Sequence, residues 1–129
     1  MTREDLVKNA ISAVNERDVD AYLACCTDDI QLYTPLAHFT GPYEGSTGIR
    51  QFFRDLDDTA PDFHLKSERF EQVGDQAAAF LRADARGRVG GVPLDLEPAN
   101  IYDFEGDRIK RVRIFSERRE ALELLGIGE

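Results

Sequence analysis

The second half of the chain constrains the fold most, because apolar and polar residues alternate almost without a break from Phe63 onward. A period of two is the pattern of a half-buried β-strand. Turn residues interrupt the alternation three times, which predicts four long strands over residues 63–73, 76–87, 92–104 and 108–116. The connections between these strands are short, so neighbouring strands are expected to pair antiparallel.

The chain begins with helical patterns. Apolar residues at helical spacing predict a first helix over about 3–16, with Thr2 and Asp5 as a capping box. Asp18 is expected to cap a short second helix, which Asp28-Asp29 then ends. The opening of the chain is therefore a helical hairpin.

One short strand and two more helices complete the pattern. A strand over about 30–34 is expected to stop at Pro35. After a loop, a third helix capped by Ser46 or Thr47 should run to just before Pro61, and a closing helix over about 117–125 follows the last strand. This order predicts an α+β fold in which helices pack on one face of a strongly curved, mostly antiparallel sheet, a cone-like shape that encloses a pocket.

Length, charge and cysteine content restrict the class of protein. The 129 residues fit a single domain, and the apolar runs are too short to span a membrane. A net charge of −9 disfavours nucleic acid and anionic membrane surfaces as partners. The start of the chain shows no apolar signal core, so we expect a soluble cytoplasmic protein. Cys25 and Cys26 are adjacent and are expected to be two buried thiols rather than a disulfide.

Several segments carry a resemblance to a known family. They are Ala13 to Ala21, Thr27 to Ile30, Gly41 to Phe53, Ile101 to Ile109 and Phe115 to Glu117. These segments resemble the SnoaL-like and ketosteroid-isomerase-like branch of the nuclear transport factor 2-like superfamily. The resemblance covers nearly the whole chain and implies one SnoaL-like domain over residues 1–129 with the cone fold. The matched residues are caps, turns and core positions, so they indicate fold more than chemistry.

The isomerases of this superfamily use a general-base Asp together with a Tyr and a protonated Asp that form an oxyanion hole. The matching positions here are Thr34, Ala10 and Asn100. Only Asn100 could still stabilise an oxyanion. Steroid isomerisation is therefore disfavoured.

The other enzymes of the superfamily match in part. Arg82-Ala83-Asp84 is similar to the Arg-x-Asp of epoxide hydrolases, but Arg113 stands where their second acid is expected. Polyketide cyclases use an acid on the last strand, and residues 108–116 contain no Asp or Glu. The candidates that remain are Asp84, Arg82 and His38 for catalysis, and, for substrate binding, Tyr33, Phe53, Asn100, Tyr102, Arg113 and Phe115. The two arginines among them favour an anionic or strongly polar ligand.

Alternation leaves the orientation of these candidates open. Asp84 and Arg82 either line the pocket or form a charge ladder on the solvent side of a strand whose Ala83 and Ala85 point inward. Arg113 is favoured inside by the resemblance, whereas hydrophobicity favours its neighbours. His38 lies in the loop at the expected pocket mouth, as a proton-transfer group or as an ordinary surface histidine.

Three hypotheses follow for function. The first is an acid/base enzyme of the isomerase, cyclase, hydrolase or lyase kind, with Asp84 as base and no cofactor or metal. The second is a non-catalytic domain that binds a small-molecule ligand in the same cavity. The third adds self-association: a homodimer formed through a sheet face that carries Ala79, Leu81, Ala83 and Ala85.

Overall fold

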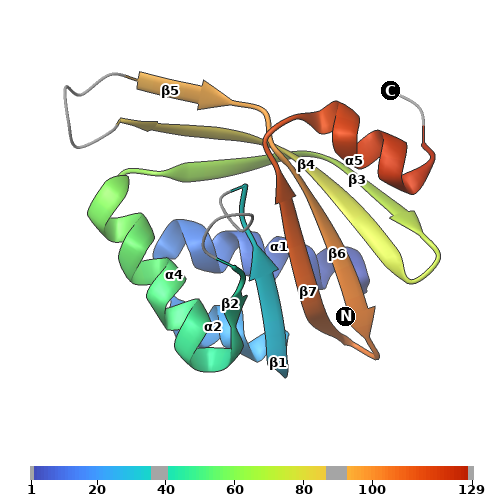
Figure 1. The fold of residues 1–129 in the computed structure, drawn as a ribbon, viewed down its shortest axis with the longest axis horizontal. Coiled ribbons are helices and arrows are strands. Elements are labelled where there is room, and N and C mark those ends of the chain that lie inside the picture. The colour runs from blue at the N-terminus through green and yellow to red at the C-terminus, as the bar shows by residue number, and fades with distance from the viewer. Residues whose placement is uncertain (1, 36–40, 87–92, 128–129) are drawn as a thin grey trace.

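The protein consists of a layer of helices packed on a curved sheet, in a computed structural model that describes residues 2–35, 41–86 and 93–127 (Figure 1). The predicted α+β class is confirmed. Three of the described helices lie on one side of the sheet and the fourth lies on the other side (Figure 1). They are α1 (Arg3–Glu16), α2 (Val19–Ala24), α4 (Gly45–Thr59) and, on the other side, α5 (Arg118–Leu125).

The sheet is antiparallel except at one place. Its strands follow the order β2-β1-β7-β6-β4-β3, with β5 paired to β4, and only β1 and β7 run parallel. The hairpins predicted between β3 and β4 and between β6 and β7 are confirmed. The strands are β1 (Cys26–Tyr33), β2 (Tyr43–Glu44), β3 (His64–Val73), β4 (Gln76–Arg86), β5 (Pro93–Leu96), β6 (Ala99–Glu105) and β7 (Arg108–Phe115).

The segment predicted as one strand over 92–104 forms two strands, which pair with different parts of β4. β5 pairs with the end of β4, from Ala83 to Arg86, whereas β6 pairs with its beginning, from Gln76 to Phe80. Pro98 lies between them, and a proline has no N–H with which to continue a ladder. Its carbonyl still accepts a hydrogen bond from the Leu81 N–H at 3.0 Å. The sheet therefore divides along β4.

Local capping explains most helix boundaries. The Thr2–Asp5 capping box of α1 is formed in both directions, and Gly126 ends α5 in the left-handed conformation, as predicted. The capping prediction for α4 is wrong: the helix already begins at Gly45, so Ser46 and Thr47 lie in its first turn. Gly48 allows this turn to approach β2, because a Cβ there would lie 2.8 Å from the Tyr43 carbonyl carbon.

The first strand is longer than predicted. β1 begins at Cys26 rather than near residue 30, so Asp28 and Asp29 lie inside the strand instead of only ending α2. Their side chains are exposed, and the pairing with β7 shifts register between Cys26 and Gln31. Because the start of this strand is irregular and faces solvent, apolar and polar residues do not alternate regularly there, and the sequence pattern does not mark it as a strand.

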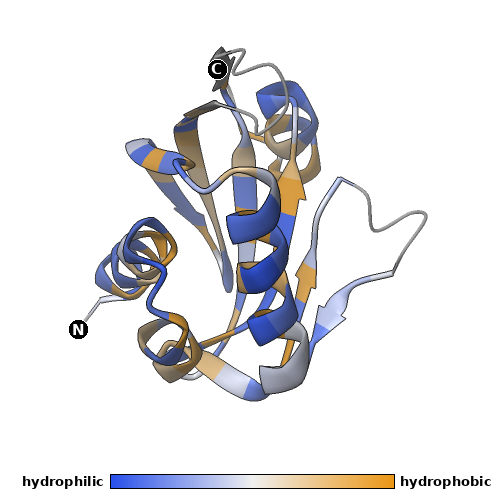
Figure 2. Ribbon diagram, turned by 90° about the vertical axis from the view of Figure 1, so that its left-hand side faces the viewer, coloured by the Kyte–Doolittle hydropathy of each residue, from blue (hydrophilic) through white to orange (hydrophobic). Residues whose placement is uncertain are grey.

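The main core lies between the helices and the concave side of the sheet. It includes Val7, Ile30, Leu32, Ile49, Leu81 and Ile109, all at most 1% exposed. Figure 2 shows the opposite, outward side of α4 as hydrophilic. A second, smaller cluster lies on the convex side under α5. No helix within the described residues is long and apolar enough to cross a membrane.

Candidate functional site

A cavity of about 210 Å³ lies inside the cone, between α1, α2, α4 and the concave side of the sheet. Most of its wall is apolar, which is typical of sites for small organic molecules. The wall is formed by Ala10, Ile11, Val14, Tyr22, Thr34, Pro35, Phe52, Leu56, Phe63, Leu65, Pro98, Asn100, Tyr102, Val112 and Ile114.

Two polar side chains of β6, those of Asn100 and Tyr102, form part of this wall. The pleat of β6 directs alternate residues to opposite faces, so Asn100 and Tyr102 point into the cavity while Ile101 packs on the convex side. Asn100 donates a hydrogen bond from Nδ2 to the Tyr102 hydroxyl at 3.1 Å. Asn100 is 7% exposed and Tyr102 is 2% exposed. The pair therefore forms a polar spot within an apolar surface.

The Tyr102 phenol is a hydrogen-bond donor at neutral pH. Burial raises its pKa to about 12, although the hydrogen bond from Asn100 acts in the opposite direction. Because its oxygen already accepts from Asn100, its own proton is left for an acceptor elsewhere. Among the described residues that line the cavity there is no Asp, Glu, His, Lys or Arg. This arrangement can bind or polarise an oxygen atom, but these residues supply no proton acceptor.

A groove at the cavity mouth carries the nearest charges. It shares Thr34, Pro35, Phe52 and Leu56 with the cavity, so the two spaces are adjacent. Tyr43 donates a hydrogen bond to Asp55 at 2.6 Å, which raises the pKa of the phenol to about 12 and lowers the pKa of the carboxyl group. The phenol and the ring of Phe52 meet edge-on, with centroids 5.5 Å apart. The mouth is thus aromatic, with an ionised carboxylate at its rim.

The structure does not place Arg82 and Asp84 in this cavity. Both are exposed on the convex side, where Arg82 forms an ion pair with Glu97 at 3.1 Å. The pleat of β4 directs its small apolar residues inward, and Ala79, Leu81, Ala83 and Ala85 are all buried. The expected catalytic pair therefore takes the charge-ladder arrangement. The expected dimer surface on those four residues is corrected for the same reason.

The remaining candidates divide between the two faces. Asn100 and Tyr102 line the cavity, whereas Tyr33, Arg113 and Phe115 lie on the convex side and their expected place in the pocket is corrected. Val112 and Ile114 occupy the inner positions of β7 instead, as their hydrophobicity suggested. Phe53 is buried in the core against Tyr22, and its neighbour Phe52 lines the cavity. His38 lies outside the described residues.

Sequence reasoning missed Tyr22 as a site residue. It falls on the apolar face of the second helix, where an aromatic ring reads as core packing. Its ring is indeed core, and the residue also lines the cavity. Cys25 and Cys26 are both free and buried, as predicted. Within the described residues no three His, Cys, Asp or Glu side chains are grouped so that they could hold a metal ion.

Comparisons with known proteins agree with the observed fold. No curated protein matches the sequence. An NTF2-like protein of unknown function from Burkholderia pseudomallei is similar in structure, with a TM-score of 0.81, 18% identity and coverage of 97% of this chain and 98% of that one. TerC, co-crystallised with polyporic acid, has a TM-score of 0.79, 16% identity and coverage of 96% and 98%.

A third similar structure is IdmH, a candidate polyketide cyclase from Streptomyces antibioticus, with a TM-score of 0.78, 17% identity and coverage of 98% of this chain and 100% of that one. At these identities the likeness concerns the fold, which is the cone expected from the sequence. The model of the SnoaL-like domain matches residues 7–112, which is most of the chain. The protein therefore belongs to the SnoaL-like domain family.

Proposed function

We propose that this protein binds a small, uncharged, largely apolar molecule that carries an oxygen acceptor, in the cavity inside the cone. The observation that carries this proposal is the Asn100–Tyr102 pair, a buried hydrogen-bonded donor in an otherwise apolar wall. Apolar pockets with a few placed polar groups are the common form of small-molecule sites, in which the polar groups fix orientation. The apolar wall would hold the body of the ligand, and the phenol would bind its oxygen.

The absence of charged groups among the described wall residues favours a neutral ligand. The sequence favoured an anionic ligand because it placed Arg82 and Arg113 in the pocket, and both lie on the other side of the sheet. An anion in this cavity would lose its hydration without gaining a cationic partner from those residues, at a cost of several kcal/mol. A ketone or an alcohol would not incur this cost.

Binding without catalysis is favoured over acid/base catalysis by the same wall. Proton abstraction requires a base within hydrogen-bond reach of the substrate. The described wall offers phenols and an amide, and Asp84 is exposed on the far side of the sheet. His38, expected at the pocket mouth, remains the base that a catalytic function would need. The cyclase assignment of IdmH belongs to that protein.

Tyr102→Phe is expected to weaken binding of 1-tetralone roughly fivefold to tenfold, while binding of tetralin changes little. The two bicyclic probes differ by one carbonyl oxygen, and a hydrogen bond contributes about 0.5–1.5 kcal/mol, where 1.4 kcal/mol is tenfold in affinity. Affinities are measured by NMR titration of wild-type protein and variant with each probe.

Tyr33→Phe is the matched control, because its hydroxyl lies on the convex side and is bonded to Gln31. This variant should bind both probes as the wild type does. The proposal is contradicted if the wild type binds neither probe, or if the two substitutions change 1-tetralone binding equally. Deuterium exchange at the α-carbon of bound 1-tetralone, compared in wild type and His38→Ala, tests for catalysis in the same samples.

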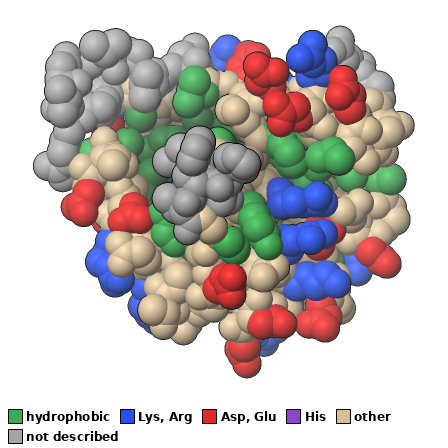
Figure 3. Space-filling model, viewed as in Figure 1, with side chains coloured by type: hydrophobic (Ala, Val, Ile, Leu, Met, Phe, Trp, Pro, Cys, Tyr) green, Lys and Arg blue, Asp and Glu red, His purple; other side chains and the backbone are tan. Residues whose placement is uncertain are grey.

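A homodimer through the convex side of the sheet is a second proposal, with different residues from those expected. On this side β7 presents Arg111 and Arg113 beside the buried carboxylate of Asp103, and Figure 3 shows Lys and Arg side chains gathered over β7 and β6. The Arg113 Nε is buried and lacks a hydrogen-bond partner among the described residues. A buried donor of this kind is costly unless another surface supplies an acceptor. A second copy of this face carries acidic groups, such as Glu44 at its edge.

Tyr33→Glu is expected to weaken this dimer at least tenfold, because the new carboxylate would lie beside Arg113 of its own copy and bind the guanidinium that the second copy would otherwise contact. The fold should be retained, since residue 33 is paired with Arg113 in the parallel register. Sedimentation velocity across micromolar concentrations measures the association. Arg119→Glu, on the exposed side of α5, is the control and should leave association unchanged. A wild type that is monomeric throughout would refute the dimer.

A further inference from the structure

Arg17 ends α1 in a backbone conformation that a residue with a side chain rarely adopts. Its φ is 56° and its ψ is 35°, and it is the one residue other than glycine with a positive φ in the described part of the chain. This left-handed region strains any residue that has a Cβ, and glycine is the usual residue at this position after a helix. The interactions of the arginine side chain must therefore offset that strain.

The guanidinium of Arg17 joins the end of α1 to the end of α4. Its Nη1 donates to the carbonyl of Val14, in the last turn of α1, at 2.6 Å. Its Nη2 donates to the carbonyls of Ala60 and Pro61, just beyond the last residue of α4, at 3.1 and 3.2 Å. Its Nε donates to the Asp57 carboxylate at 2.9 Å. All three nitrogens are therefore bonded, and only 17% of the side chain is exposed.

These bonds place one positive charge between two negative helix ends. The carboxyl end of a helix carries a partial negative charge, because its last carbonyls have no partner within the helix. Both helices lie wholly within the described residues, and neither has a basic residue in its last turn. Glu16 and Asp57 add negative charge at the two ends. Without Arg17 the ends of α1 and α4 would repel each other.

The segment that Arg17 holds at the end of α4 belongs to one side of the cavity. Leu56 precedes the bonded residues and Phe63 follows them, and both line the cavity. Leu56 also lines the groove at the mouth, together with Thr59. The carbonyls that Arg17 binds therefore lie in the short stretch that connects two parts of the wall.

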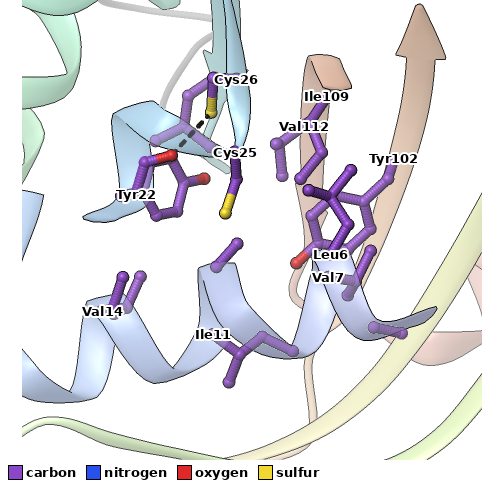
Figure 4. Packing of buried hydrophobic residues seen from close by; sticks show 14 of the residues in the cluster. Leu6, Val7, Ile11, Val14, Tyr22, Cys25, Cys26, Tyr102, Ile109 and Val112 are labelled. Carbon is purple, nitrogen blue, oxygen red and sulfur yellow. Dashed lines mark hydrogen bonds between the residues drawn. The ribbon is translucent and has the colours of Figure 1, made fainter. Parts of the chain in front are cut away.

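The α1 side of this contact belongs to the cavity as well. Val14, whose carbonyl Arg17 binds, lines the cavity, and Figure 4 shows its side chain directed from α1 toward Tyr22, another wall residue. The neighbouring Asn15 bonds both backbone groups of Leu65 in β3. The end of α1 is thus joined to β3 by Asn15 and to α4 by Arg17.

We propose that Arg17 is a positioning residue that holds the end of α4 against α1 and thereby limits how fast the ligand enters and leaves the cavity. This inference rests on the proposed function and adds the control of access to the same site. Arg17 is a described residue that lines neither the cavity nor the groove, so it acts through the end of α4. When its bonds are lost, the two helix ends separate and the wall at Leu56 and Phe63 opens. Opening lowers the barrier to entry and to exit alike, and it leaves the contacts of the bound ligand in place.

Arg17→Gly tests the proposal, because glycine keeps the left-handed end of α1 without strain and removes only the side chain. We expect the association and dissociation rate constants of 1-tetralone both to rise roughly tenfold, while its dissociation constant changes by less than about twofold. Both rate constants are measured by NMR line-shape analysis of titrations. Loss of a contact to the ligand would instead raise the dissociation rate constant alone, and a purely structural role would change neither in the folded protein.

Arg50→Ala is the matched control. Arg50 also joins α4 to another helix, through an ion pair with Asp20 of α2 at 2.9 Å, but it lies near the beginning of α4. Neither of these two described residues lines the cavity or the groove. The variant should leave both rate constants of 1-tetralone unchanged. Equal acceleration in Arg50→Ala and Arg17→Gly would show a general loosening of α4 and overturn the role of Arg17.

Amide hydrogen exchange gives a readout that needs no ligand. The Ala60 N–H is bonded to the Leu56 carbonyl at 2.8 Å, and the Phe63 N–H is bonded to the Ala60 carbonyl at 3.0 Å. Arg17→Gly should raise the exchange rates of these two amides roughly tenfold more than that of the Leu81 N–H in β4, which lies in the core of the sheet. An increase no larger than that of Leu81 would show a loss of overall stability and refute the proposal.

The outcomes separate this inference from the proposed function. If 1-tetralone binds with the same rate constants in wild type and Arg17→Gly, the proposed function stands and the role of Arg17 is refuted. If Arg17→Gly changes the dissociation constant in parallel with the dissociation rate constant, Arg17 supports the bound ligand and does not control access. If the wild type binds neither 1-tetralone nor tetralin, the proposed function fails and the control of access fails with it.

Discussion

Asn15→Ala is expected to lower the free energy of unfolding by about 2–4 kcal/mol, because one side chain satisfies two backbone groups of the neighbouring sheet. Asn15 projects from α1, donates from Nδ2 to the Leu65 carbonyl at 2.8 Å and accepts at Oδ1 from the Leu65 N–H at 2.7 Å. It thus pairs with β3 as a neighbouring strand would. Without it, both partly buried groups of Leu65 lose their partner. Leu65 also lines the cavity, so the loss should loosen the wall of the site.

Urea denaturation of wild type and variant measures the change, and Ser12→Ala is the matched control. Ser12 lies three residues earlier on the same helix with an exposed side chain, and alanine there should shift the free energy of unfolding by no more than about 0.5 kcal/mol. Equal destabilisation by the two substitutions would show that the effect comes from the helix and not from the link to Leu65. Unchanged stability in Asn15→Ala would show that water replaces the side chain at this position.

The fold could be predicted well because its main signals are local. The alternation after Phe63, the capping box at Thr2 and the glycine at 126 each act over a few residues, and the structure confirms them. One feature that the sequence did not predict is non-local. The parallel pairing of β1 with β7 joins opposite ends of the chain, and no short-range pattern reports it. The division of β5 from β6, in contrast, has a local signal in Pro98, which the alternation of apolar and polar residues does not take into account.

The site could be predicted only in part, because alternation identifies two faces of a strand without saying which one meets the helices. On β4 the small apolar residues face inward and the charged pair Arg82 and Asp84 faces solvent, as hydrophobicity alone suggests. The resemblance pointed to Arg113, and the structure places Val112 and Ile114 at the inner positions. Tyr22 gave no sequence signal, because a buried phenol and a core aromatic ring look alike in a helical pattern.

Asp103 is the residue in which the convex side of the sheet departs most from an ordinary solvent face. Only 8% of its side chain is exposed, yet it lies between Tyr102 and Phe104, whose side chains belong to the core on the other face. Its carboxylate accepts from Gln76 at 2.6 Å and from Arg111 at 2.5 Å, and Arg113 lies 3.7 Å away. Burial alone would raise the pKa of this carboxyl group, but these hydrogen bonds and the two guanidinium charges outweigh burial and lower it.

Asp103→Asn is expected to cost about 2 kcal/mol of stability at pH 7 and to make stability less dependent on pH in the acid range. A carboxyl group with a lowered native pKa stabilises the fold above its unfolded pKa of about 3.9, and this contribution is lost as pH falls through the native value. The difference in unfolding free energy between wild type and variant should therefore be constant from pH 7 to about pH 5 and shrink below pH 4. Urea denaturation at a series of pH values measures it.

Asp107→Asn, in the exposed turn between β6 and β7, provides the comparison, because it removes the same charge from the chain without removing a buried network. If both variants change the pH profile alike, overall charge explains the effect and Asp103 has no special role. If only Asp103→Asn changes the pH profile, the ionised carboxylate holds the side chains of Arg111 and Arg113 in position. The same arginines form the centre of the proposed dimer face. Sedimentation velocity of Asp103→Asn would then show whether dimer formation also depends on their position.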